Sequence, residues 1–191
     1  MRRLVAHNFI TLDGVAVPDA VIDTIAELRD VDEVLTPFFA RMAEEDAMLL
    51  GRVTYQEWAD HWPQISDQPF ADHINSVPKY VVSTTLEQAP WGTGPDATLI
   101  GGDIDEEITR LKQEAGGPIG LHGSPTLVES LVHEDLIDEL RLEIFPVVAG
   151  RGARLFRDGA ASKRLRLLAS HTTSNGVIIA SYGPNSGERP S

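Results

Sequence analysis

Two segments of the chain place glycine and hydroxyl side chains where a helix is expected to begin. The first is Gly51-Arg52-Val53-Thr54-Tyr55, which follows the apolar run 47–50. The second is Ile119-Gly120-Leu121-His122-Gly123-Ser124-Pro125-Thr126. Free backbone amides and the helix dipole make a helix N-terminus suitable for binding an anion. Two such strand-to-helix junctions predict a site that holds one dinucleotide.

Each junction also has an explanation that involves no ligand. Thr54 and Glu57 have the spacing of a capping box, which satisfies free amides in any helix. Ser124 followed by Pro125 is a common helix start, and Gly123 then only permits a tight turn. The local pattern leaves both interpretations open.

Two further clusters, Ser83-Thr84 and Gly101-Gly102, follow other apolar runs. Ligands of open α/β sheets bind outside the carboxyl ends of the strands, so we expect all four clusters at one edge of a sheet. Arg52 offers a charge-assisted, forked hydrogen bond to a phosphate. This favours NADPH, which carries a 2′-phosphate, over NADH.

The motifs of several other chemistries are missing. His133-Glu134 begins a zinc-protease motif, but Ile137 stands in place of its second histidine, so a metal site is not expected. His122 occupies the first glycine position of a nucleophile elbow, which argues against a serine hydrolase. Neither the dinucleotide-binding Gly-x-Gly-x-x-Gly nor the P-loop motif occurs, and there is no cysteine for thiol chemistry.

Composition indicates one soluble globular domain. The chain has 191 residues, 42% of them hydrophobic, and no apolar run near the roughly 20 residues that cross a bilayer. Residues 1–183 are expected to form this domain and 184–191 a flexible tail. The N-terminus does not have the pattern of a signal peptide, which predicts a cytoplasmic protein.

The charge is unevenly distributed. A net charge of −13 argues against nucleic acid and anionic membranes as partners. Residues 141–191, however, carry eight Lys/Arg and three Asp/Glu, a net +5. Three of these cations, Arg151, Arg154 and Arg157, lie close together. They form either a solvated basic loop or a contact with an acidic neighbouring subunit or a phosphorylated ligand.

The apolar periodicity predicts alternating strands and helices, and then three strands without helices between them. This order indicates a parallel sheet covered on both faces, with an antiparallel C-terminal edge. Residues 34–46 are expected to form a helix on the sheet. Residues 140–144 alternate between apolar and charged, which predicts a half-exposed antiparallel strand. Residues 56–78 are expected to be irregular, and their aromatic side chains form a lid, a pocket wall or ordinary surface packing.

Blocks along the chain resemble the dihydrofolate reductase superfamily, and especially the C-terminal reductase domain of the riboflavin-biosynthesis deaminase/reductase. They occur in family order and are Thr11-Leu12-Asp13-Gly14, Leu50-Gly51-Arg52-Val53-Thr54-Tyr55, Pro78-Lys79-Tyr80-Val81-Val82-Ser83, Gly120-Leu121-His122-Gly123-Ser124-Pro125-Thr126-Leu127, and the segment from Asp138 to Gly152. The resemblance implies a three-layer α/β fold around a mixed, mostly parallel eight-stranded sheet. It also implies bound NADPH, hydride transfer to a pyrimidine of the riboflavin pathway or a pterin-like ring, and a homodimer.

The resemblance further assigns roles by position. Those implied for the cofactor are Gly51, Arg52, Val53 and Thr54 at its phosphates, Ser83 and Thr84 at its adenosine end, Gly123, Ser124, Thr126 and Leu127 at its pyrophosphate, and the backbone of Phe9 near its nicotinamide.

Asp13 is the carboxylate singled out for the substrate, where it would hydrogen-bond or protonate a ring nitrogen. An ordinary Asp-Gly turn explains it equally well. Two functions therefore stay open: an NADPH-dependent reductase, and a nucleotide-binding or regulatory module of the same fold without turnover.

Overall fold

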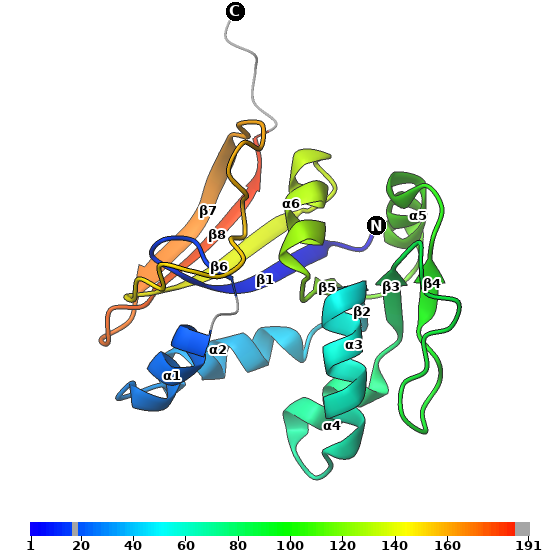
Figure 1. Cartoon of the computed structure of the whole chain (residues 1–191), viewed down its shortest axis with the longest axis horizontal. Coiled ribbons are helices and arrows are strands. Elements are labelled where there is room, and N and C mark those ends of the chain that lie inside the picture. The colour runs from blue at the N-terminus through cyan, green and yellow to red at the C-terminus, as the bar shows by residue number, and fades with distance from the viewer. Residues whose placement is uncertain (17–18, 186–191) are drawn as a thin grey trace, which may run out of the picture.

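The protein is built on one eight-stranded sheet (Figure 1). The computed structural model describes residues 1–16 and 19–185, and only the backbone of 19–22 and 69. The strands are β1 Leu4–Thr11, β2 Ala47–Gly51, β3 Lys79–Val82, β4 Thr98–Ile100, β5 Ile119–Leu121, β6 Glu139–Phe145, β7 Leu165–Thr172 and β8 Ile178–Pro184. They lie in the order β4-β3-β2-β5-β1-β6-β8-β7, parallel from β4 to β6 and antiparallel from β6 through β8 to β7. The predicted mixed sheet with an antiparallel C-terminal edge is confirmed.

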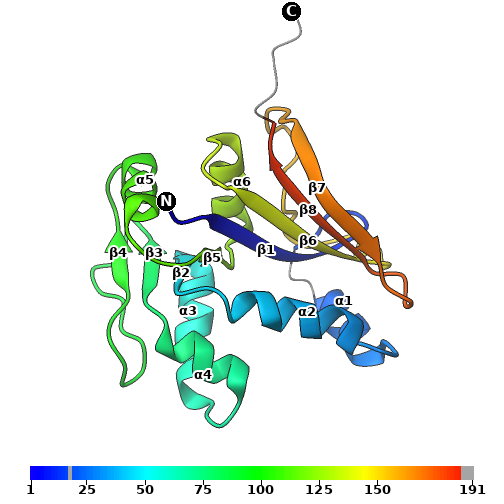
Figure 2. The same cartoon turned by 180° about the vertical axis from the view of Figure 1, so that it is seen from behind.

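Helices cover both faces of the sheet. They are α1 Asp19–Glu27, α2 Asp32–Met42, α3 Arg52–His61, α4 Pro69–Ser76, α5 Ile104–Gln113 and α6 Pro125–His133, with a 3-10 turn η1 at Trp62–Gln64. Helices α5 and α6 pack on one face, and α2, α3 and α4 lie on the opposite face, as the two views show (Figures 1 and 2). The sheet is therefore the middle of three layers.

The two faces of β1 are covered differently because its side chains alternate. Leu4 and Ala6 belong to the large apolar core beneath α5 and α6. His7 and Phe9 point the other way, toward Phe38 of α2. The face beneath α2 thus mixes aromatic and ionisable side chains, whereas the opposite face is apolar.

Several local predictions were wrong in detail. The helix predicted at 34–46 runs from Asp32 to Met42, and helices α1 and α4 were not predicted at all. Strand β8 continues through Pro184, one residue past the predicted domain end, and residues 186–191 of the predicted tail lie outside the described residues.

The prediction for strand β6 differs most from the structure. This strand lies between β1 and β8, parallel to β1 and, as predicted, antiparallel to β8, but it is mostly buried instead of half-exposed. Glu139 and Glu143 are 7% and 2% exposed. Arg141, with its Nε 2.6 Å from Oε1 of Glu139, supplies the opposite charge that a buried carboxylate requires. The charged residues of this strand therefore lie in the protein interior, where Arg141 pairs with Glu139, and do not face solvent.

Candidate active site

The two predicted junctions pack directly against each other. Strands β2 and β5 are neighbours, so Gly51 and Gly123 meet at their carboxyl ends, where the amide of Gly51 donates a 2.8 Å hydrogen bond to the carbonyl of Gly123. A Cβ on Gly51 would lie 2.6 Å from Oγ of Ser124 and 2.9 Å from its backbone nitrogen. Glycine is therefore required at position 51 because the two chain segments approach so closely.

Two helices begin at this contact with uncapped N-termini. Gly51 and Ser124 are the N-cap residues of α3 and α6, and neither helix receives a side-chain capping hydrogen bond. The capping box predicted from Thr54 and Glu57 is thus wrong, because α3 already starts at Arg52. Neither first turn contains an acidic residue. The amides of both first turns are left available to an anion placed between the helices.

The side chains predicted at the cofactor phosphates differ in their exposure to solvent. Arg52 is exposed, and its Nη1 donates a 2.9 Å hydrogen bond to Oε1 of Gln56 one turn along α3. Val53 is 49% exposed, and Thr126 also faces solvent. Leu127, in contrast, is buried in the core. Leu127 can therefore contribute only its backbone amide to a ligand.

The cluster predicted at the adenosine end follows β3. Oγ of Ser83 accepts hydrogen bonds from the amides of Thr85 (3.2 Å) and Leu86 (3.1 Å), which holds the loop that follows the strand. Thr84 and Gly101, which follows the neighbouring β4, are exposed. The structure thus brings this pair of loops to the same edge as the two helix N-termini.

Both carboxylate oxygens of Asp13 accept hydrogen bonds, from its own turn and from the loop after β6. Its Oδ1 accepts hydrogen bonds from Oγ1 of Thr11 (2.6 Å) and the amide of Ala149 (3.0 Å), and its Oδ2 accepts one from the amide of Gly150 (2.8 Å). These bonds to the ionised form lower the pKa of Asp13 to about 2. The geometry accounts for Asp13 as a residue that joins the end of β1 to the loop after β6, and it does not favour a proton donor.

A buried group of ionisable residues lies on the face of the sheet that α2 covers, where no site was predicted from the sequence. Glu45, in the turn between α2 and β2, bridges two imidazoles: Nε2 of His7 is 2.7 Å from Oε1, and Nε2 of His122 is 2.7 Å from Oε2. The contact to His122 has the direction of a hydrogen bond, while the contact to His7 is close but not aligned as one. The two rings are parallel, with centroids 5.3 Å apart.

The His7–Glu45–His122 cluster is almost fully enclosed, with its side chains 1%, 1% and 4% exposed. Burial opposes ionisation of Glu45, but the charge and hydrogen bond of His122 and the nearby His7 outweigh it and hold its pKa at about 2. Burial lowers the pKa of His7. Gly120 makes room for the cluster, since a Cβ there would lie 1.8 Å from Oε2 of Glu45.

The same face carries a second buried carboxyl. Glu143 on β6 pairs in register with Phe9 on β1, two residues beyond the pair formed by His7 and Arg141 and therefore on the same face. Burial raises the pKa of Glu143 to about 7, against the opposing charges of Arg41 and Arg141. The face between β1, β5, β6 and α2 therefore combines aromatic rings with groups that can exchange protons.

The predicted basic stretch is partly neutralised by acidic side chains of the same chain. Two arginines of the basic stretch have partners within the chain: Arg157 binds the buried Glu129, and Arg154 lies 3.6 Å from Asp158. Within residues 1–16 and 19–185 there is no group of three or more His, Asp or Glu side chains that could hold a metal ion. Among those residues no helix is long and apolar enough to cross a membrane.

Comparison with known proteins agrees with this architecture. The family model of the RibD C-terminal domain matches residues 2–179. Two Bacillus subtilis proteins of uncharacterised function are each 30% identical: YyaP over 95% of this chain and 94% of its own length, and YwjB over 87% and 89%.

Solved structures show the same fold. A protein from Shewanella sp. PV-4 assigned to riboflavin biosynthesis superposes with a TM-score of 0.76 at 23% identity, covering 95% of this chain and 98% of its own. Dihydrofolate reductase from Enterococcus faecalis, solved with NADP(H), gives 0.60 at 13% identity over 96% and 97%. The chain belongs to the RibD C-terminal domain family and has the dihydrofolate-reductase-like fold.

Proposed function

We propose that this protein is an NADPH-dependent reductase that transfers a hydride to a small heterocyclic substrate, either a pyrimidine or a pterin-like ring. The observation that carries the proposal is the meeting of two uncapped helix N-termini at the carboxyl ends of β2 and β5. Such an arrangement suits a pyrophosphate, and the chain's family and the fold it shares with an NADP(H)-bound reductase support the same conclusion.

The residues present fit NADPH. First-turn amides of α3 and α6, from Val53, Thr54, Thr126 and Leu127, would bind the pyrophosphate, and the close packing of Gly51 on Ser124 keeps side chains out of that space. Arg52 is exposed and projects from the first turn of α3, so it is free to leave Gln56 for the 2′-phosphate. Bound there, the nicotinamide supplies the hydride.

Reduction of a C=N or C=O bond also needs a proton, which goes to the nitrogen or oxygen as the hydride goes to carbon. Asp13 stays a predicted source, but both of its oxygens accept hydrogen bonds, from Thr11 and from the loop after β6. His122 is better placed, since it follows β5 directly, precedes Gly123 of the cofactor junction, and is oriented by its hydrogen bond to Glu45. Burial of the His7–Glu45–His122 cluster keeps bulk water away from this proton.

The first experiment is titration with NADPH and NADH of the wild-type protein and of Arg52→Ala. Because the arginine is assigned to the 2′-phosphate, the variant should lose affinity for NADPH and keep its weaker affinity for NADH. Equal losses for both cofactors would show that Arg52 does not hold the 2′-phosphate. Absence of any nicotinamide binding by the wild-type protein would remove the reductase proposal altogether. Cofactor binding without NADPH consumption across pyrimidine, pterin and other heterocyclic substrates would favour the module without turnover.

A further inference from the structure

The outermost strand of the sheet, β7, is exposed along almost its whole length (Figures 1 and 2). Seven of its eight residues are exposed, and Leu165 is the exception. Strand β8 pairs with one side of β7, and in the part of the chain that the structure describes no strand pairs with the other side. The backbone N–H and C=O groups of a free edge can pair with a strand from another chain.

The regular part of this edge has little protection against such pairing. Proteins commonly protect an edge strand with proline, with charged side chains or with a bulge. Strand β7 contains no proline, and a bulge interrupts its ladder to β8 only between Leu167 and Ala169. Residues 169–172 beyond the bulge form a regular ladder and carry the small or polar side chains of Ala, Ser, His and Thr. These four residues can therefore accept another strand.

Exposed apolar side chains lie on both sides of this segment. Leu167 is 52% exposed and Leu168 is 39% exposed, and Ile178, which pairs with Thr172, is 39% exposed. Leu167 pairs with Tyr182, which lies four residues from Ile178 along β8, so Leu167 and Ile178 share one face of the sheet. Apolar side chains at a free edge favour a partner that removes them from water.

Opposite charges lie at the two ends of β7. Arg164 and Arg166 are exposed at its start. At its other end the turn to β8 is joined to an acidic segment, residues 23–33, because the amide of Ser174 donates a 2.7 Å hydrogen bond to Oε2 of Glu33. This segment contains five carboxylates and one arginine. The two ends are roughly 25 Å apart, beyond the Debye length of about 8 Å, so they do not neutralise each other within one copy.

This distribution of charge is complementary to a second copy of the same chain. In an antiparallel pair of β7 strands related by a two-fold axis, each basic start lies beside the acidic segment of the other copy. Pairing centred on residues 169–172 brings Arg166 of one protomer opposite the turn that holds the partner's Glu33. Parallel pairing would instead place cations beside cations and carboxylates beside carboxylates. The charges therefore favour an antiparallel, symmetric contact.

We propose that residues 169–172 of β7 pair antiparallel with the same residues of a second copy, so that one sheet continues through both subunits of a homodimer. The contact also covers Leu167 and Leu168. It is independent of the reductase proposal, because the cofactor junctions lie at the ends of β2 and β5, on the other side of β1.

Sedimentation velocity across the micromolar range, at low and at high salt, tests the dimer. We expect a dimer whose dissociation constant rises with salt, because salt screens the exposed charge contacts. Leu167→Lys should weaken it at least about tenfold, since it places a cation among the covered side chains. Val148→Lys is the matched control: Val148 is an apolar residue, 68% exposed, that lies outside β7, and its replacement adds the same charge. This control should leave the dissociation constant unchanged.

A charge exchange tests the antiparallel arrangement. Arg164→Glu/Arg166→Glu reverses the basic start, and Glu27→Lys/Asp32→Lys reverses part of the acidic segment without removing Glu33 from Ser174. Each double variant alone should weaken the homodimer at least about tenfold, because the two-fold axis repeats every unfavourable contact. An equal mixture of the two should restore the dimer, because both contacts of the mixed pair then join opposite charges.

Hydrogen exchange measured by mass spectrometry tests the strand pairing itself. Amides of residues 165–172 should exchange more slowly in the wild-type dimer than in monomeric Glu27→Lys/Asp32→Lys, whose substitutions lie outside this segment. Circular dichroism and the thermal unfolding temperature of each variant confirm that the fold is retained.

Four results would overturn the inference. They are a wild-type monomer at every concentration, equal effects of Leu167→Lys and Val148→Lys, failure of the mixed double variants to associate, and exchange of residues 165–172 at the same rate in dimer and monomer.

Discussion

Replacement of Glu143 by glutamine should stabilise the protein in a strongly pH-dependent way. The Glu143 carboxyl is 2% exposed, one of its oxygens has no hydrogen-bond partner among the described residues, and burial raises its pKa from 4.5 to about 7. A pKa shift of one unit corresponds to about 1.36 kcal/mol. The folded protein therefore carries a free-energy cost of roughly 3 kcal/mol when this carboxyl is ionised in both the folded and the unfolded states.

The sign and the pH range follow from the two pKa values. Above pH 7 the carboxyl is ionised in both states, so the full cost is present. Between pH 7 and 4.5 the folded protein takes up the proton first, and the cost disappears as the pH falls. Glu143→Gln should consequently raise the free energy of unfolding by up to roughly 3 kcal/mol at pH 8 and leave it unchanged at pH 4.

Urea unfolding at pH 8, 6 and 4 measures this difference, and at pH 8 thermal unfolding should shift upward by roughly 6 to 12 °C. Glu139→Gln provides a control of opposite sign on the same strand. Burial opposes ionisation of Glu139, but Arg141, Ser181 and Arg3 outweigh it and hold its pKa at about 2, so its loss should destabilise the protein at pH 8. If Glu143→Gln has the same effect at pH 8 and pH 4, or destabilises at pH 8, then Arg41 and Arg141 compensate the buried charge and the reasoning fails.

Two further changes test the candidate site. Gly51→Ala should lower NADPH affinity by at least about tenfold in a binding titration, because its Cβ would lie 2.6 Å from Oγ of Ser124 and separate the two helix N-termini. Gly102→Ala, where a Cβ meets nothing within 4 Å, should bind NADPH normally, and equal behaviour of the two variants would contradict the packing argument. Glu45→Gln should be less stable than wild type at pH 7, because the folded pKa of Glu45 is lowered to about 2 from 4.5, and this difference should shrink as the pH falls below 4.5 toward 2. Thermal unfolding across that range measures it, and a difference independent of pH would show that the charge of Glu45 is not what stabilises the fold.

The fold class was predictable because its signals are local. Apolar runs followed by glycine and hydroxyl residues mark strand ends, and their alternation with helical periodicity is sufficient to indicate a mostly parallel sheet. For the same reason the two junctions at Gly51 and Gly123 could be expected at one edge of the sheet. The exact helix start was not predictable, since Thr54 has the spacing of a capping box with Glu57, whereas α3 begins at Arg52, two residues before Thr54.

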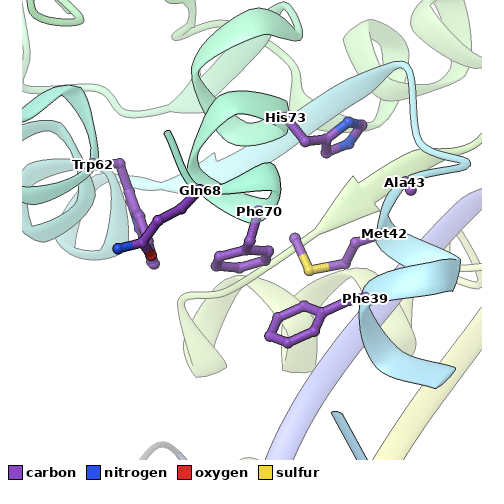
Figure 3. Close-up of a pocket in the computed structure, with 7 residues that line it drawn as sticks. All are labelled: Phe39, Met42, Ala43, Trp62, Gln68, Phe70 and His73. Carbon is purple, nitrogen blue, oxygen red and sulfur yellow. The ribbon is translucent and has the colours of Figure 1, made fainter. Parts of the chain in front are cut away.

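Aromatic residues between 56 and 78 left a lid, a pocket wall and surface packing equally open. The structure shows that Trp62 and Phe70 line a pocket opposite α2 (Figure 3). Sequence spacing could not distinguish these possibilities, because α2, which forms the other wall, ends twenty residues before η1 begins. Only the packing of η1 and α4 against that helix decides which faces of the rings are covered.

The sequence alone was sufficient to predict the succession of the eight strands, the mixed sheet and the glycine–hydroxyl junctions that indicate a dinucleotide, but not helices α1 and α4. Which ionisable groups come into contact in the interior could be seen only in the tertiary structure. His7, Glu45 and His122 have no diagnostic spacing in the chain, but β1 and β2 lie on either side of β5, and Gly120 leaves the space in which the three side chains meet. A histidine in an apolar strand and a glutamate before one were the available signals, yet their pairing depends on strand order, which local sequence does not encode. Charges on β6 were misjudged for the same physical reason, since whether a polar side chain faces water or a partner is fixed by what packs against it.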